Sequence, residues 1–137
     1  MSDFLLDTCA VIWIANDDGL REPASSELPE ACDRGSRLFV SPMTAWEIAM
    51  LVAKGSITLT ISPDVWFERF CEQPGVALAE MSPSVLIAST ILPGTPPADP
   101  VDRILVATAR EFGYTLVTRD GDLLEYGTKG HIKAIGC

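Results

Sequence analysis

Short runs of hydrophobic residues alternate with longer segments whose apolar residues recur at helical spacing. The runs are continuous rather than alternating, which is typical of parallel strands buried on both faces. They predict strands near residues 3–7, 37–40, 76–80, 114–118 and 131–135. The longer segments predict helices near residues 8–16, 23–34, 42–54, 63–72, 83–91, 102–112 and 120–125. This alternation indicates an α/β fold: a three-layer α/β/α sandwich with a mostly parallel sheet of about five strands.

Three of the predicted helices begin with the same dipeptide. A serine is followed by proline at Ser41-Pro42, Ser62-Pro63 and Ser82-Pro83. Serine can accept a hydrogen bond from a free backbone N–H, and proline at the first helical position removes no helical hydrogen bond. Gly55 and Gly113 stand where two helices are expected to end. These signals predict the helix boundaries more sharply than the apolar pattern does.

Length and composition predict one domain that spans residues 1–137, with 47% hydrophobic residues. That content excludes a disordered chain. No apolar run approaches the roughly 18 residues that span a bilayer, and no signal peptide is evident. We therefore expect a cytoplasmic protein without a membrane partner. The four scattered cysteines lack C-x-x-C spacing, which favours reduced thiols over disulfides.

The formal net charge of −9 argues against a protein that binds nucleic acid through a basic face. The chain carries 19 acidic and 10 basic residues. Once the five acidic residues of the candidate site described next are set aside, the remainder is only mildly acidic. A metal ion bound by those acids would reverse the local field where a phosphate must approach.

Four acidic residues lie after predicted strands or inside apolar helices. Asp7 and Asp120 each follow a strand, and ligands of parallel sheets bind beyond the carboxyl ends of the strands. Glu47 is the only charged residue within residues 42–53, so we expect it to be partly buried. Asp102 opens a helix of largely apolar residues. If these carboxylates converge, their repulsion of roughly 4 kcal/mol per pair at about 4 Å requires a cation.

Simpler roles stay open for several of these acids. Asp7 and Asp120 can also cap the helices that follow them, and Glu47 can be a lone exposed position. Either Asp99 or Asp102 can be the cap of one helix. We interpret Asp102 as the inner ligand and Asp99 as an accessory acid.

An all-oxygen set of ligands predicts Mg²⁺ or Mn²⁺ as the cofactor. Zinc is not expected, because His131 is the only histidine and no cysteine pair has ligand spacing. His131 is also remote in the sequence from the acids, so we do not expect it to act as a general base. Trp13, Trp46 and Trp66 stand at apolar helical positions, so we expect them in the core rather than stacked on bases.

Four neighbouring residues are candidates for supporting roles. Arg103 and Arg119 flank two of the acids and can contact substrate phosphates, or can form surface ion pairs. Thr8 and Thr118 stand next to Asp7 and near Asp120, where their hydroxyls can orient ligands or water.

At these residues the chain resembles the PIN-domain family, specifically the VapC-type toxins of bacterial toxin–antitoxin pairs. The matching stretches are Leu5–Thr8, Ser41–Ala49, Ala98–Ala109 and Leu116–Asp120. The resemblance implies an Mg²⁺- or Mn²⁺-dependent endoribonuclease whose acidic ligands are Asp7, Glu47, Asp102 and Asp120. It also implies an RNA substrate, a homodimer, and a small antitoxin protein that inhibits the toxin.

Two other functional classes stay open. A catalytically inactive PIN-like binding module would use the same site only to hold a partner. A phospho-receiver signalling domain would also be an α/β unit with acids at strand ends. It requires an aspartate after the third strand and a lysine after the fourth, where this chain has Glu80 and residues 118–120, Thr-Arg-Asp.

Overall fold

A five-stranded parallel sheet forms the centre of the protein, which is described by a computed structural model over residues 3–137. The strands, in chain order, are β1 (Phe4–Leu6), β2 (Leu38–Val40), β3 (Val76–Leu78), β4 (Thr115–Thr118) and β5 (Lys133–Gly136). The helices are α1 (Thr8–Ala15), α2 (Ala24–Asp33), α3 (Pro42–Ala53), α4 (Pro63–Cys71), α5 (Pro83–Ala88), α6 (Pro100–Phe112) and α7 (Gly121–Thr128). The predicted alternation of strands and helices is therefore confirmed.

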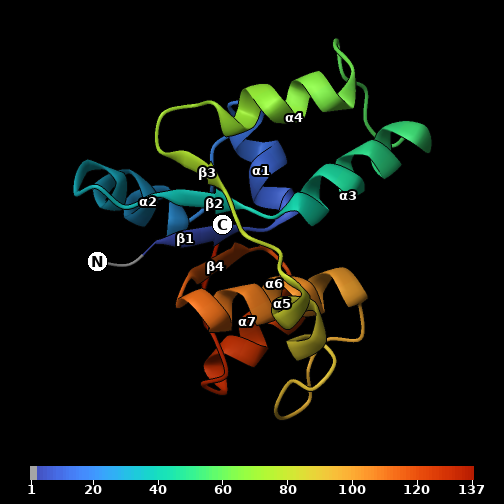
Figure 1. Ribbon diagram of the computed structural model, residues 1–137. Coiled ribbons are helices and arrows are strands. Elements are labelled where there is room, and N and C mark those ends of the chain that lie inside the picture. The colour runs from blue at the N-terminus through green and yellow to red at the C-terminus, as the bar shows by residue number, and fades with distance from the viewer. Residues whose placement is uncertain (1–2) are drawn as a thin grey trace.

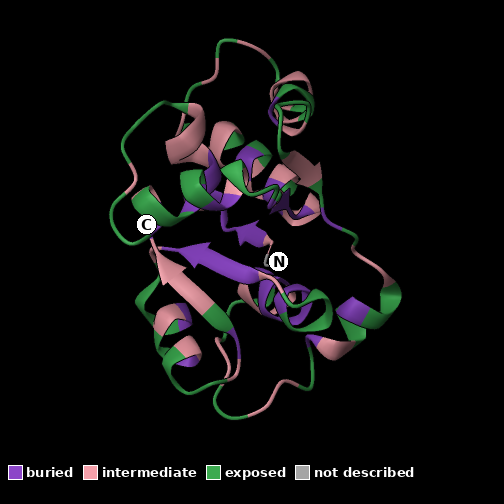
Figure 2. Cartoon of the chain, turned by 90° about the vertical axis from the view of Figure 1, so that its left-hand side faces the viewer, coloured by how far each residue is buried: buried purple, intermediate pink, exposed green. Residues whose placement is uncertain are grey.

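Helices cover both faces of the sheet, as the continuous apolar runs predict. Phe4 and Leu6 pack with α1, α2, α3 and α4, whereas Leu5 packs with α6 and α7. In Figure 1 the α1–α4 group lies on one side of the strands and α5–α7 on the other. Figure 2 shows the buried strands between these two layers. The three-layer α/β/α sandwich is confirmed.

The order of the strands in the sheet is β3-β2-β1-β4-β5. The chain builds outward from β1 through β2 and β3, and then returns to add β4 and β5 on the other side. The point between β1 and β4 is therefore the switch point at which open parallel sheets bind ligands. Receiver domains have the different order 2-1-3-4-5, so this topology removes the phospho-receiver interpretation.

The serine–proline dipeptides begin three helices, as predicted. Ser41 and Ser82 accept side-chain hydrogen bonds from the N–H groups of Met43 and Val85, while Ser62 caps without such a bond. Gly113 ends α6 in the left-handed conformation, with φ of 73°. Its missing Cβ is what makes this conformation accessible.

Three sequence predictions are corrected. Helix α6 begins at Pro100 rather than at residue 102, because Asp99 is its N-cap. Helix α7 continues to Thr128. Trp46 is not a core residue: its side chain is 53% exposed on α3, on a different face from the buried Thr44 and Ile48.

Among the described residues, no helix is long and apolar enough to span a membrane. All four cysteines are free.

Candidate active site

Asp7 leaves the carboxyl end of β1 and is the N-cap of α1. Its backbone N–H continues the parallel pairing by donating to Val117 O at 3.0 Å. Its Oδ1 accepts from the Thr8 N–H at 2.7 Å, and its Oδ2 accepts from the Thr118 hydroxyl at 2.7 Å. Asp7 is buried, and this burial raises the pKa of its carboxyl despite the two hydrogen bonds. Asp7 therefore caps α1, and its buried carboxyl stays a candidate ligand.

Thr118 connects Asp7 to Asp120. Its fully buried hydroxyl donates to Asp7 and also accepts from the Asp120 N–H at 3.0 Å. Asp120 is exposed and caps α7, with Oδ1 accepting from the N–H groups of Asp122 and Leu123. One hydroxyl thus fixes the carboxyl ends of the adjacent strands β1 and β4 relative to each other.

Glu47 projects from α3 and is partly buried, as its apolar helix predicts. The Thr8 hydroxyl at the start of α1 donates a hydrogen bond to Glu47 Oε1. The same hydroxyl lies 3.2 Å from the hydroxyl of Thr44, which is fully buried one turn before Glu47. Burial, and then the charges of Asp7 and Asp99, raise the pKa of Glu47, whereas the Thr8 hydrogen bond lowers it.

Asp99 and Asp102 have different environments although both lie at the start of α6. Asp99 is exposed, and its Oδ1 accepts from the N–H groups of Val101 and Asp102 at 2.8 and 3.3 Å. Asp102 is half-buried in the first helical turn. Burial, followed by the charges of Asp7, Asp99, Asp120 and Glu47, raises the pKa of Asp102 to about 7. The structure thus assigns the capping role to Asp99 and places Asp102 in the field of the other acids.

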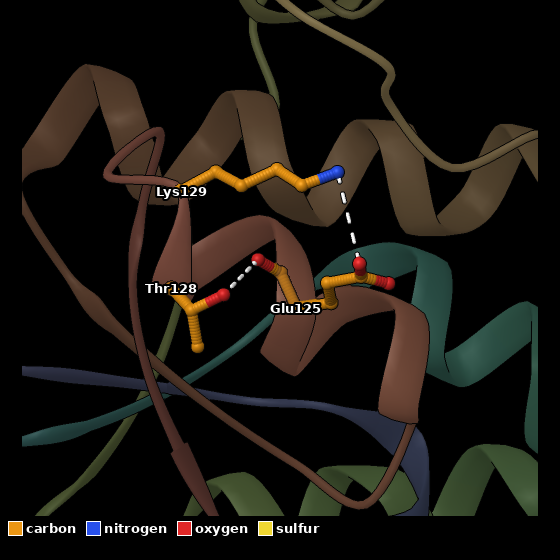
Figure 3. A network of polar contacts seen from close by, with 3 residues as sticks. All are labelled: Glu125, Thr128 and Lys129. Carbon is orange, nitrogen blue, oxygen red and sulfur yellow. Dashed lines mark hydrogen bonds and ion pairs between the residues drawn. The ribbon is translucent and has the colours of Figure 1, made fainter.

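Among residues 3–137, no basic side chain forms an ion pair with these acids. Within residues 3–137 the one salt bridge joins Lys129 to Glu125 at 3.7 Å, at the far end of α7 from Asp120 (Figure 3). Thr128 donates to the Glu125 carbonyl in the same exposed network. Acidic side chains therefore lie near the ends of β1 and β4 without a basic side chain paired to them in the described part of the chain.

The PIN domain family model matches residues 4–129, which is most of the chain. The chain belongs to the PIN-domain family. It is 32% identical over 120 residues to "Ribonuclease VapC22" of Mycobacterium tuberculosis, covering 88% of both chains. Its fold resembles VapBC2 from Rickettsia felis, solved bound to a promoter DNA fragment (TM-score 0.67, 13% identity, 97% of both chains). It also resembles FitAcB from Neisseria gonorrhoeae (TM-score 0.53, 18% identity, 96% of this chain and 95% of that one).

The side chains at the centre of this PIN domain fit a hard divalent cation better than a soft one. The available donors are carboxylate oxygens, and the acids that raise the pKa of Asp102 lack a basic partner among the described residues. As they stand, however, no three His, Cys, Asp or Glu side chains of residues 3–137 are arranged to hold one metal ion. Ligation of one ion by Asp102, Glu47 and Asp7 stays a prediction.

The two arginines that flank the acids in this PIN domain have structural contacts. Arg119 lies over the Trp13 ring, with its guanidinium carbon 3.7 Å from the ring centroid, and its Nε donates to Cys137 O at 2.7 Å. Arg103 reaches Ser89 O at 3.4 Å. Neither forms a surface ion pair in the described chain. Substrate contact by these arginines stays a prediction.

Two residues of the site were missed in the sequence. Thr44 stands three residues before Glu47, and this i, i+3 spacing on one helix face could have indicated it. The Cys9 thiol lies 3.8 Å from Asp7 Oδ2 as a weak donor. Burial, and then the Asp7 charge, raise the pKa of Cys9 to about 12, so the thiol keeps its proton. No local sequence signal distinguishes Cys9 from the other scattered cysteines.

Proposed function

We propose that this PIN-domain protein is a divalent-metal-dependent endoribonuclease and the toxin of a toxin–antitoxin pair. The observation that carries the proposal is the group of acids Asp7, Glu47, Asp102 and Asp120, which interact electrostatically and have no basic partner in the described chain. The similarity to a VapC ribonuclease over 88% of the chain supports the same activity. Mg²⁺ or Mn²⁺ is the proposed cofactor, and RNA is the proposed substrate.

The four carboxylates would hold the metal, and the threonines would fix two of them. A divalent cation in such a site makes its bound water more acidic and neutralises charge on a phosphodiester. The Thr118 hydroxyl donates to Asp7 Oδ2, and the Thr8 hydroxyl donates to Glu47 Oε1. The second carboxylate oxygen of Glu47 accepts no hydrogen bond from Thr8. Asp102 is proposed as the inner ligand and Asp99 as an accessory acid, because Asp99 already caps α6.

A small antitoxin protein is the proposed partner. Solved structures with this fold include the VapBC2 and FitAB complexes bound to DNA. On this chain, Trp46 is exposed beside a hollow of about 460 Å³ between α3 and α4, lined by Ala45, Trp46, Ala49, Pro63, Asp64 and Phe67. Exposed tryptophans beside apolar hollows are typical of protein-binding surfaces. A homodimer in the cytoplasm is the expected state of the free toxin.

RNA cleavage by the purified protein tests this function. Wild type is incubated with single-stranded RNA and Mg²⁺ or Mn²⁺, with and without EDTA, beside Asp7→Asn. Glu111→Gln is the matched control, because it removes one exposed negative charge from the end of α6 opposite Asp102. We expect cleavage by wild type and Glu111→Gln only, and only with metal. Cleavage that survives both EDTA and Asp7→Asn would refute the metal mechanism, and tight RNA binding without cleavage would favour the inactive binding module.

A further inference from the structure

A chain of hydroxyl groups leads from the core of the protein to one of the acidic side chains. The Thr44 hydroxyl on α3 lies 3.2 Å from the Thr8 hydroxyl on α1, and Thr8 in turn hydrogen-bonds Glu47 Oε1. Thr44 is 0% exposed and Thr8 is buried. Because Thr44 and Glu47 belong to α3 while Thr8 belongs to α1, this series of hydroxyl contacts also joins two helices that pack against each other.

The direction of these hydrogen bonds follows from the number of protons. An ionised Glu47 can only accept, so the single hydroxyl proton of Thr8 is donated to Glu47 Oε1. Thr8 therefore has no proton left for Thr44, and the 3.2 Å contact requires Thr44 to donate to Thr8. Within the described chain this is the hydrogen bond that satisfies the buried Thr44 hydroxyl. The hydrogen bonds thus connect Thr44 to Glu47 through Thr8.

We propose that Thr44 is a positioning residue for Glu47: it holds the Thr8 hydroxyl in the orientation that donates to Glu47 Oε1. The inference rests on the proposed metal-dependent function and names a residue that this function does not otherwise need. Hydrogen bonds in series strengthen one another, and partners behind a metal ligand set its orientation. Without the Thr44 hydroxyl, the Thr8 hydroxyl is free to rotate, and the Glu47 carboxylate loses its fixed orientation.

Two substitutions of Thr44 separate the hydroxyl from the shape of the side chain. Thr44→Val keeps the branched shape in the core but removes the donor. Thr44→Ser keeps the donor but removes a buried methyl group. If the Thr44 hydroxyl positions Glu47, the two substitutions have opposite effects. Thr44→Val binds metal more weakly with little loss of thermal stability. Thr44→Ser unfolds at a lower temperature but binds metal as wild type does.

The experiment is a titration of the full chain with Mn²⁺, followed by the electron paramagnetic resonance signal of the free ion, with thermal unfolding of each variant recorded in EDTA. Thr108→Val is the matched control, because Thr108 is also a buried helical threonine and its hydroxyl donates to Ile104 O within its own helix. We expect Thr44→Val to bind Mn²⁺ about tenfold more weakly, which is the lower end of effects from partners behind metal ligands. Thr44→Ser and Thr108→Val should match wild type.

Each contrary outcome is distinct. Wild-type affinity in Thr44→Val, or weakened affinity in a folded Thr44→Ser, would overturn the positioning role while leaving the proposed function intact. Equal weakening in Thr108→Val would assign the effect to lost core polarity in general and would also overturn it. A wild-type chain that binds no Mn²⁺ would overturn the metal-dependent function and this inference together.

Discussion

Replacing Asp102 by Asn should stabilise the metal-free protein, and increasingly so as the pH rises. Asp102 is half-buried, and the charges of four other acids act on it. Its folded-state pKa is about 7, against 3.8 for an unperturbed aspartate. Asparagine has a similar shape without the charge. The substitution therefore removes the repulsion and leaves the packing at the start of α6 unchanged.

The sign follows from proton binding. Between about pH 4 and pH 7 the folded chain keeps a proton on Asp102 that the unfolded chain has lost, so the contribution of Asp102 to stability falls as the pH rises through this window. A shift of about three units corresponds to about 4 kcal/mol at most. Solvent screens this half-buried group, so we expect Asp102→Asn to gain about 1–2 kcal/mol over wild type between pH 5 and pH 8.

Urea denaturation in EDTA at pH 5, 6, 7 and 8 measures this difference directly. Glu111→Gln is again the control, because it removes an exposed charge from the same helix. Its stability should run parallel to that of wild type across the series. If the curves of Asp102→Asn and wild type are also parallel, Asp102 does not lie in the field of the other acids, and the reasoning is refuted.

Three further results are expected. Thr118→Val leaves Asp7 Oδ2 and the Asp120 N–H without their shared partner, so chemical denaturation should show a loss of about 1–3 kcal/mol; an unchanged midpoint would contradict the bridge. Arg119→Ala removes the contact with the Trp13 ring, so it should lower the free energy of unfolding by about 1 kcal/mol and alter tryptophan fluorescence. Arg103→Ala should have neither effect. Mg²⁺ at a hundredfold excess over its Kd should stabilise wild type by about 2.7 kcal/mol in thermal unfolding, but not Asp7→Asn.

Local signals in the sequence predicted most of the fold. Serine–proline dipeptides begin three helices, and at two of them the serine side chain caps the helix, because this chemistry acts within one turn. The sequence left open whether Asp99 or Asp102 caps α6, and the capping Asp99 followed by Pro100 places the start of that helix at residue 100. The order of the strands had no local signal, because it depends on which strands meet after the chain has folded.

The acids were recognisable from the sequence because each stands in apolar surroundings or after a strand. The division of roles between Asp99 and Asp102 was harder to predict from the sequence, because it depends on which backbone N–H groups each carboxyl contacts. Trp46 was misplaced because α3 is apolar on every side, so its pattern does not show which face packs. The spacing of Thr44 from Glu47 was a signal in the sequence, but the contact of Thr44 with the Thr8 hydroxyl depends on how α1 packs against α3.

The central claim is that the four acids hold one or more divalent cations at the ends of β1 and β4. Crystals soaked in Mn²⁺ and measured for anomalous scattering test it most directly. We predict an anomalous peak with oxygens of Asp7 and Asp102 within about 2.5 Å, with Glu47 and Asp120 contributing directly or through water. A peak bound by Asp99 with Asp102 turned away would reverse their roles, and full-occupancy Mn²⁺ elsewhere with none at these acids would contradict the account.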